Sequence, residues 1–435
     1  MRYRSTLHRS PEVSLRDAVL HGSAPDGGLY MPVEIPRLES DYLEHLPSLT
    51  FHEIAQDVGE LFCGDEVPAQ VLMSIVTESF NFPVPLITLN ERLHILELFH
   101  GPTLAFKDFG ARFMARLMAY FVAESGKELT VIVATSGDTG SAVAQAFLGV
   151  SGIHVVILYP AGRVSSAQEK QLTTLGENIT ALEVSGSFDD CQRLAKQALV
   201  DPVLAERLTV TSANSINIAR LIPQSFYYFA AVAQLDAPEA PLMFSVPSGN
   251  FGNLTGGLLA KRIGLNIAQF IAATNANDVV PEFLRSGKLI PRASQHTLSN
   301  AMDVGNPSNF ARIVDLYGND LQAIRRDLWG CSFSDEETLR AMHDVEHNYG
   351  YVLDPHTAVG VLGWESYAKQ NARAAQGIVL ATAHPAKFAE TVARAVGVRP
   401  ETPERLAAFL DRPKKSISFP NRFPELQEFL LSTNS

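Results

Sequence analysis

Short apolar segments alternate with amphipathic helical patterns along most of this chain of 435 residues. Each segment has five to seven residues, and a turn rich in glycine, serine or asparagine follows it. The segments are 94–99, 130–136, 155–160, 179–184, 208–213, 242–247, 270–274 and 377–383. Short buried strands that alternate with helices are typical of parallel sheets. The pattern therefore predicts an α/β fold, although it does not give the order of the strands.

The chain before this alternation is organised differently. Residues 1–85 mix short amphipathic helices with loops, and a proline-rich stretch, NFPVPLITL, closes them off. In parallel sheets, ligands bind at the carboxyl ends of the strands, where the chain turns into the next helix. Candidate functional residues are therefore expected in the turns that follow the predicted strands.

Length and composition narrow the class of protein. The chain is longer than a single hydrophobic core usually supports, so its length predicts roughly two to three domains. Apolar residues make up 46% and charged residues 19%, as in globular proteins, and the formal charge is −12. This acidity argues against a nucleic acid or an anionic membrane as the main partner, because phosphate groups need a cationic surface.

Two further features concern the cellular compartment. No apolar run reaches the roughly 20 residues of a membrane helix, and the N-terminus lacks the apolar core of a secretory signal. Cys63, Cys191 and Cys331 are far apart and lack the spacing of a metal site. We therefore expect a cytoplasmic protein with buried free thiols, no membrane partner and no metal ion.

Lys107 is the candidate for covalent chemistry. It lies in the string HGPTLAFKDFGARFMARLMAYF, directly after the strand predicted at 94–99. The helix that begins near it has an apolar face with a period of four: Phe109, Phe113, Leu117 and Phe121. In an apolar cleft, loss of water would lower the pKa of Lys107, as imine formation and proton transfer require. The alternative is a lysine on the surface, although helix starts favour acidic residues.

The turn PSGNFGN after the strand 242–247 has the composition of a phosphate-binding loop. Gly249 and Gly252 allow close approach of the backbone to a ligand, and a helical pattern follows them. Backbone N–H groups at the start of that helix would complete an anion site. Small polar donors surround the glycines: Ser248, Asn250 and Asn253. The alternative is a tight turn that binds no ligand.

The turn ATSGDTGSA after the strand 130–136 is a second glycine loop. Its hydroxyl and N–H groups are suited to a carboxylate, with Ser136 and Thr139 as candidates. Asp138 has the alternative role of helix N-cap, for which aspartate is a usual choice.

A third polar turn, SANSINIAR, follows the strand 208–213. Asn214, Ser215 and Asn217 are compact donors, and Arg220 follows one helical turn later. The planar guanidinium of arginine suits a phosphate group. Turns of this composition are common, so the motif alone leaves a ligand-free loop open.

The last predicted strand, 377–383, includes Thr382, and the string HPAKF comes after it. We expect His384 to be a structural residue of a turn and Lys387 to be a solvated helix residue.

Together these strings make the sequence closely resemble the threonine synthases of the bacterial and fungal type, in the fold-type II group of pyridoxal-phosphate (PLP) enzymes. The similarity covers nearly the whole chain. The most specific strings are HGPTLAFKDF, SANSIN and SVPSGNFGN, supported by DGGLYMP, QEKQLTTLGENI, TLSNAMDVGNPSN and ATAHPAKF.

The resemblance implies a role for each candidate. Lys107 resembles the lysine that forms the Schiff base with PLP, and Thr382 the hydroxyl that faces the pyridine nitrogen. The residues that hold the cofactor phosphate would be Ser248, Gly249, Asn250, Phe251, Gly252 and Asn253. The substrate carboxylate would be bound by Ser136 and Thr139. The leaving phosphate would be bound by Asn214, Ser215 and Arg220.

Asp138 departs from the wider group, in which many relatives have an asparagine that contacts the ring oxygen of the cofactor. Two ionised oxygens would repel each other there. The resemblance therefore implies either that Asp138 is protonated or that it turns toward the substrate ammonium group.

The resemblance also implies an architecture and a reaction. It implies an N-terminal domain (1–88), a large α/β domain that binds PLP (89–128 and 236–435) and an inserted α/β domain over the substrate (129–235). The expected enzyme is a carbon–oxygen lyase, a monomer or homodimer. It would release phosphate from O-phospho-L-homoserine and add water to give L-threonine.

Three other functions stay open at this stage. A phospholyase or a β-eliminating deaminase of the same fold would share Lys107 and the loop 248–253 but need not use Arg220. A non-catalytic PLP-binding protein would have no need of Lys107. An α/β protein without PLP would use the glycine turns only to begin helices.

Overall fold

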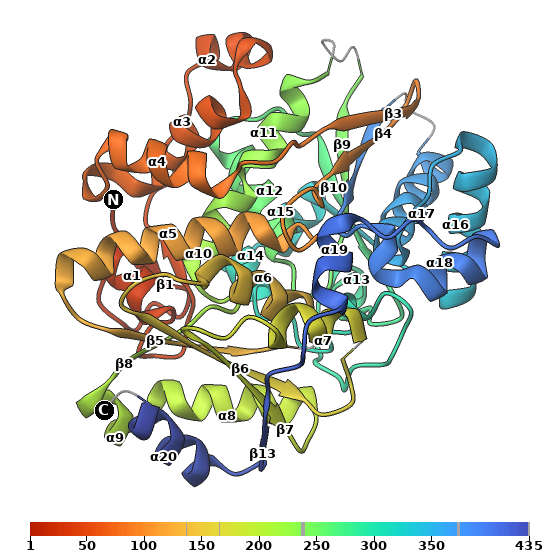
Figure 1. Cartoon of the computed structure of the whole chain (residues 1–435). Coiled ribbons are helices and arrows are strands. Elements are labelled where there is room, and N and C mark those ends of the chain that lie inside the picture. The colour runs from red at the N-terminus through yellow and green to blue at the C-terminus, as the bar shows by residue number, and fades with distance from the viewer. Residues whose placement is uncertain (136, 165, 236–239, 372–374, 434–435) are drawn as a thin grey trace.

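The computed structural model describes residues 1–435 except 136, 165, 236–239, 372–374 and 434–435. Within this range the strands form three sheets, with helices packed around them (Figure 1). The predicted α/β fold is confirmed, and all eight predicted strand segments contain a strand.

The N-terminal region is small and mainly helical. A two-stranded antiparallel sheet pairs β1 (Tyr3–Ser5) with β2 (Tyr30–Pro32). The helices of this region are α1 (Leu15–His21), α2 (Ser40–His45), α3 (Phe51–Cys63) and α4 (Ala69–Ser79). Helix α3 begins with a capping box between Thr50 and Glu53, and its apolar face is buried against α4 and α11 (Phe226–Ala233).

The larger sheet has the strand order β11-β10-β9-β12-β4-β3. Its neighbouring strands are parallel except for the edge strand β3, which is antiparallel to β4. The strands are β3 (Leu86–Asn90), β4 (Leu93–Glu97), β9 (Leu242–Pro247), β10 (Gln269–Thr274), β11 (Leu328–Ser332) and β12 (Gln376–Ala381).

Helices cover both faces of this sheet. Helix α17 (Pro355–Gln370) lies against β9, β10 and β12, and α16 (Asp335–Tyr349) packs on it. Further helices are α5 (Lys107–Ser125), α10 (Ile218–Leu221), α12 (Gly252–Ile263), α13 (Val279–Ser286), α14 (Phe310–Leu316), α15 (Leu321–Asp327), α18 (Ala389–Val396) and α19 (Glu404–Leu410). The short 3₁₀ helices are η1 (Leu46–Ser48), η2 (Gly64–Glu66), η3 (Ile222–Gln224), η4 (Asn300–Met302) and η5 (Pro385–Phe388).

The predicted apolar face of α5 is confirmed. The helix begins at Lys107, and its four face residues are fully buried: Phe109, Phe113, Leu117 and Phe121. Phe113 stacks on Phe80 with ring centroids 6.3 Å apart, so α5 is fixed to the N-terminal region.

The smaller sheet is parallel throughout, in the order β13-β7-β6-β5-β8. Its strands are β5 (Leu129–Ala134), β6 (Ile153–Pro160), β7 (Ile179–Val184), β8 (Thr209–Ser212) and β13 (Ile417–Phe419). Its helices are α6 (Asp138–Phe147), α7 (Ser166–Thr173), α8 (Phe188–Val200), α9 (Pro202–Arg207) and α20 (Phe423–Thr433).

The C-terminal end of the chain differs from the predicted division of the sequence, which placed it with the larger sheet. Strand β13 pairs with β7, and α20 packs on α8 of the smaller sheet. The cause is apolar burial, because Phe419, Leu426 and Leu430 belong to the core of that sheet.

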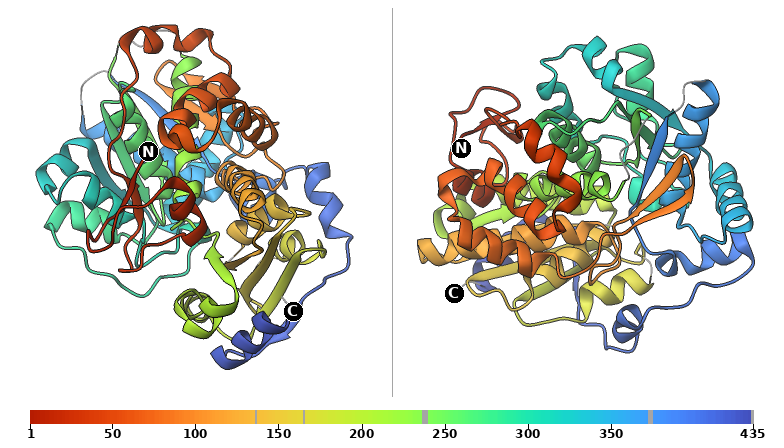
Figure 2. Two further views of the ribbon diagram at one scale, coloured as in Figure 1. Left: turned by 90° about the vertical axis from the view of Figure 1, so that its left-hand side faces the viewer. Right: turned by 90° about the horizontal axis from the view of Figure 1, so that it is seen from above.

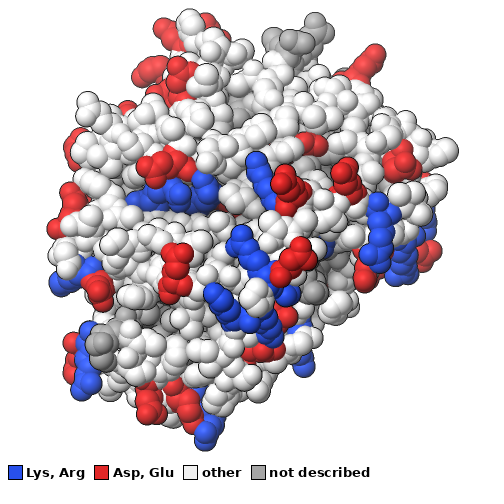
Figure 3. All heavy atoms as spheres, viewed as in Figure 1, with Lys and Arg blue, Asp and Glu red and all other residues white. Residues whose placement is uncertain are grey.

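The two larger sheets are separate layers, with the N-terminal helices packed beside both (Figure 2). On the face drawn in Figure 3, acidic and basic side chains are interspersed, without a large area of one sign among the described residues. Of the helices that the structure describes, none has the length and apolar character needed to cross a membrane. Cys63 and Cys191 are buried free thiols, as predicted, whereas Cys331 is only half-buried.

Candidate active site

Lys107 lies after β4, beside the carboxyl end of the neighbouring strand β12. The loop between β4 and α5 is hydrogen-bonded to the chain after β12, because Phe106 N–H donates to the Thr382 carbonyl over 2.9 Å. The N–H of His384 likewise donates to the Leu104 carbonyl over 3.0 Å. The fold therefore brings Lys107 and Thr382, two of the predicted cofactor residues, to the same place.

The environment of Lys107 favours its neutral amine. Burial lowers the pKa of Lys107 to about 8, with Asp138 acting in the opposite direction and Arg220 and Lys387 adding to the decrease. Its side chain remains half-buried, so a ligand can reach it. This agrees with the pKa decrease that the sequence predicted.

Two bulky residues of the candidate loops adopt left-handed backbone conformations. Leu104, three residues before Lys107, has φ 57°, and Phe251, in the glycine loop after β9, has φ 61°. This conformation is strained for such residues, and strain of this kind is concentrated at ligand sites. Both outliers lie in loops that the sequence assigned to PLP.

Asp108 anchors the loop that precedes Lys107. Its carboxylate accepts bonds from the N–H and hydroxyl groups of Thr103, over 2.9 and 2.7 Å. Burial raises the pKa of Asp108 to about 6, although these bonds and the charge of Lys387 work against the increase.

The loop Ser248–Asn253 joins β9 to α12 and is tightly packed. A Cβ atom on Gly249 would lie 2.6 Å from Met302 Cα, so this position needs glycine. The hydroxyl of Ser248 donates to the Val246 carbonyl over 3.1 Å, and the amide of Asn253 donates to the Pro247 carbonyl over 2.9 Å. The N–H of Leu254 in the first turn of α12 is bonded to Asn253 Oδ1 over 3.0 Å. The other backbone N–H groups at the start of this helix are suited to an anion.

The loop after β8 connects the two sheets. The Ser215 hydroxyl accepts a bond of 2.6 Å from the amide of Asn250, in the glycine loop of the larger sheet. The side-chain amide of Asn214 donates to the Ala134 carbonyl over 2.8 Å. It connects β5 and β8 where they end.

Arg220 is buried beside the start of α5. Its Nη1 donates to the Ala213 carbonyl over 2.6 Å, whereas its buried Nε has no hydrogen-bond partner among the described residues. Burial lowers the pKa of Arg220 to about 10, which still leaves it charged at neutral pH. A buried guanidinium with an unsatisfied donor is suited to an anionic ligand.

The structure corrects two predictions at Asp138 and Lys387. Lys387 is not solvated: it is 6% exposed, and its Nζ lies 2.7 Å from Asp138 Oδ1. Asp138 is not the helix N-cap, because Gly137 occupies that position and Asp138 is the first residue of α6. Burial alone would raise the pKa of Asp138, but Lys387 and Lys107 hold it below its usual range, so the carboxyl is ionised.

The remaining predicted residues have less distinctive surroundings. Thr139 is half-buried in the first turn of α6, and Ser136 lies outside the described residues. His384 is the structural residue that was predicted, since its ring nitrogen accepts the N–H of Ala386 at the start of η5. The described residues contain no group of three or more side chains that could hold a metal ion.

The sequence analysis missed Arg312, which organises the site from α14. Its guanidinium is fully buried and donates to the carbonyls of Tyr30, Ser215 and Ile216 and to Asn309 Oδ1, over 2.6–3.1 Å. Asn309 in turn donates to the Ser215 hydroxyl over 3.1 Å. The available signal was the polar turn GNPSN, which lies just before Arg312 in the sequence.

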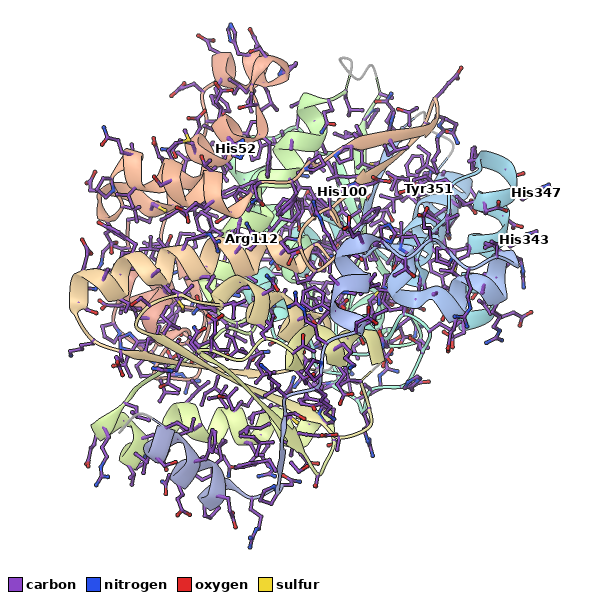
Figure 4. All side chains as sticks on the ribbon, viewed as in Figure 1. His52, His100, Arg112, His343, His347 and Tyr351 are labelled. Carbon is purple, nitrogen blue, oxygen red and sulfur yellow. The ribbon has the colours of Figure 1, made fainter. Side chains whose placement is uncertain are left out.

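Other polar clusters lie outside this site. His343 and His347 project from α16 at the edge of the molecule, and Figure 4 shows them far from the start of α5. His100 and Tyr351 both bond Glu97, over 2.6 and 2.7 Å, and line a neighbouring cavity of about 410 Å³. Both carboxylate oxygens of Glu97 are already bonded, so Glu97 is not free to bind a ligand in this cavity.

Known proteins match this chain over its whole length. The family models that match are "Threonine synthase N terminus" (residues 2–80), "Pyridoxal-phosphate dependent enzyme" (80–384) and "Threonine synthase, C-terminal" (357–430). A threonine synthase of Serratia marcescens is 44% identical, over 97% of this chain and 96% of its own. The crystal structure of threonine synthase from Escherichia coli is 42% identical with a TM-score of 0.93, covering all of both chains. A PLP-bound threonine synthase from Brucella melitensis is 38% identical with a TM-score of 0.92, covering 99% of this chain and 98% of that one.

Proposed function

The chain belongs to the threonine synthase family of PLP-dependent enzymes, and from this premise we propose that it converts O-phospho-L-homoserine and water into L-threonine and phosphate. The observation that carries the proposal is that an amine with a lowered pKa and a buried guanidinium lie close together. The half-buried Lys107 has a lowered pKa, and beside the start of its helix lies the buried Arg220 with an unsatisfied donor. The first group suits a cofactor aldehyde, and the second suits a substrate phosphate.

The residues of the larger sheet fit the cofactor. The loop Ser248–Asn253 would hold its phosphate through backbone N–H groups, since close packing at Gly249 keeps that backbone in place. Thr382 would place its hydroxyl against the ring nitrogen, and Lys107 would bind the aldehyde carbon. When bound, PLP supplies an electron-accepting ring next to the substrate Cα.

The smaller sheet would supply the substrate contacts. Arg220 and Ser215 would bind the leaving phosphate, while Thr139 and Ser136 would bind the α-carboxylate. Asn214 would act indirectly, by fixing the ends of β5 and β8. These assignments place the cofactor phosphate and the substrate phosphate on loops from different sheets, joined by the Ser215–Asn250 bond.

Lys107 is also the residue we assign to proton transfer. In the overall reaction, Cβ loses a proton and gains the hydroxyl of water, and the Cγ–O bond breaks as phosphate leaves. Cγ then gains a proton, and the proton removed from Cα returns. A lysine with a pKa of about 8 exchanges protons readily near neutral pH.

The test is a product assay with the PLP-loaded protein and O-phospho-L-homoserine. Threonine and phosphate should appear in equal amounts, and a Lys107→Ala variant should form neither. Phosphate with 2-oxobutyrate in place of threonine would identify a phospholyase or deaminase instead, and no phosphate would exclude the substrate.

A second measurement tests the lysine assignment directly. Borohydride reduction of the PLP-loaded protein followed by peptide mapping should place the label on Lys107. Label on Lys170, Lys261 or Lys387 would contradict the assignment.

The proposal extends to the setting of the enzyme. We place it in the cytoplasm, as a monomer or homodimer, with the inserted domain at 129–235 closing over the substrate. Light scattering of the purified protein and fractionation of cells test the first two statements.

A further inference from the structure

The ion pair between Lys387 and Asp138 joins the two large sheets inside the molecule. Lys387 belongs to η5, after β12 of the larger sheet, and Asp138 begins α6 of the smaller sheet. Their side chains are 0% and 4% exposed, with Nζ and Oδ1 2.7 Å apart. The pair is therefore an internal contact between the sheets and lies beside Lys107.

Each partner has a second anchor that fixes its direction. Lys387 also donates to the Thr103 carbonyl over 2.9 Å, and the N–H and hydroxyl groups of Thr103 bond the carboxylate of Asp108. Asp138 also accepts a bond of 2.9 Å from the amide of Gln168 in α7. The geometry of the pair is thus set from both sheets.

Packing alone does not account for this pair. Removing two charges from water costs several kcal/mol per ion, and apolar residues of similar size often stabilise a fold at least as well. The charges of Lys387 and Asp138 also act on the amine of Lys107, and this effect offers another reason for the pair. Three charged groups act on it: Asp138 from α6, Lys387 from η5 and Arg220 from α10.

In the absence of Lys387, the cation best placed to pair with Asp138 would be Lys107. That pairing would keep Lys107 protonated and unable to attack an aldehyde. We propose, on the basis of the proposed function, that Lys387 is a positioning residue: it holds the Asp138 carboxylate in an ion pair so that Lys107 stays free to react.

The test compares Lys387→Met, Asp138→Asn and the double variant with the unaltered protein. Competitive acetylation of the full chain without cofactor, followed by mass spectrometry, reports the pKa of Lys107 between about pH 6 and about pH 10. This reading needs neither PLP nor the substrate. Lys261→Met is the matched control, because Lys261 forms a 2.7 Å pair with Asp327 away from the site.

The expected changes have opposite signs. Lys387→Met removes a neighbouring cation and leaves Asp138 to Lys107, so the pKa of Lys107 should rise and its labelling near neutral pH should slow by about tenfold. Asp138→Asn removes an anion that acts on Lys107 and should lower that pKa. The double variant should lie between them, and Lys261→Met should match the unaltered protein.

A pKa of Lys107 that does not rise in Lys387→Met would overturn the proposal. If that variant does not fold, the Asp138→Asn result decides, and an unchanged or raised pKa there overturns it equally. Failure of the proposed function would appear elsewhere, as absence of threonine or of cofactor label on Lys107 in the unaltered protein.

Discussion

Replacing Arg220 with methionine should reduce kcat/KM without reducing the stability of the fold. The structure gives this guanidinium one hydrogen bond, to the Ala213 carbonyl, and an unsatisfied Nε in a buried position. Loss of a charge-assisted bond to the substrate phosphate costs about 1.5–3 kcal/mol, which is roughly a 10- to 150-fold loss in kcat/KM. Stability should change in the other direction or not at all, because the substitution removes a buried charge that has no carboxylate bonded to it.

The assay has three parts. Steady-state kinetics with O-phospho-L-homoserine measures the loss, and absorbance of bound PLP shows whether the cofactor site is intact. Thermal unfolding measures stability, with Arg312→Met as the matched control. Arg312 is an equally buried arginine, but its guanidinium makes four bonds to three carbonyls and Asn309, so its loss should destabilise the fold clearly.

Homoserine, which lacks the phosphate, provides the internal comparison. Its weak interaction with the PLP-loaded protein should barely respond to Arg220→Met. If the variant loses PLP, or if both compounds are affected equally, then Arg220 is structural or binds the cofactor. Either result would refute the assignment of the substrate phosphate.

Substitutions at three further positions test other parts of the site. Gly249→Ala should weaken PLP retention by about 1–3 kcal/mol, because the new Cβ would lie 2.6 Å from Met302 Cα; equilibrium dialysis measures this, and unchanged retention would contradict it. Thr382→Ala should weaken retention by only about 0.5–1.5 kcal/mol, the worth of one neutral hydrogen bond, while Thr382→Asp should alter the product ratio by protonating the ring. Asp108→Asn should change the pH dependence of stability. Because the pKa of Asp108 is raised to about 6, the folded protein binds more protons at this group than the unfolded chain between about pH 4 and pH 6. The contribution of Asp108 to stability therefore falls as pH rises through this window, by roughly 3 kcal/mol at most. Denaturant unfolding of both proteins at pH 4 and pH 6 isolates this contribution, because the stability of the unaltered protein relative to Asp108→Asn should fall from about pH 4 to about pH 6.

The sequence predicted the parts of the site that local pattern determines. The four-residue period of α5 located its first turn at Lys107, and the glycines after β9 marked a loop whose backbone must approach another group. Both inferences use residues within one turn or one helix, where spacing alone restricts the structure.

Contacts between distant segments could not be predicted in the same way. Lys387 was interpreted as a solvated helix residue because lysines usually are, and its partner Asp138 lies in the other sheet. Strand β13 was missed because it has three residues, two of them exposed, and only pairing with β7 makes it a strand. In each case the deciding interaction joins parts of the chain that no local pattern connects.

The hydrogen bonds of Arg312 connect α14 with the N-terminal region and with the loop after β8. Its guanidinium bonds carbonyls of Tyr30 in the N-terminal region and of Ser215 and Ile216 in the loop after β8, while α14 carries it near the larger sheet. Asn309, one turn before it, donates to the same Ser215 hydroxyl that accepts from Asn250. A shift of the N-terminal region would therefore move the loop after β8, and with it the proposed substrate contacts, relative to the cofactor loop.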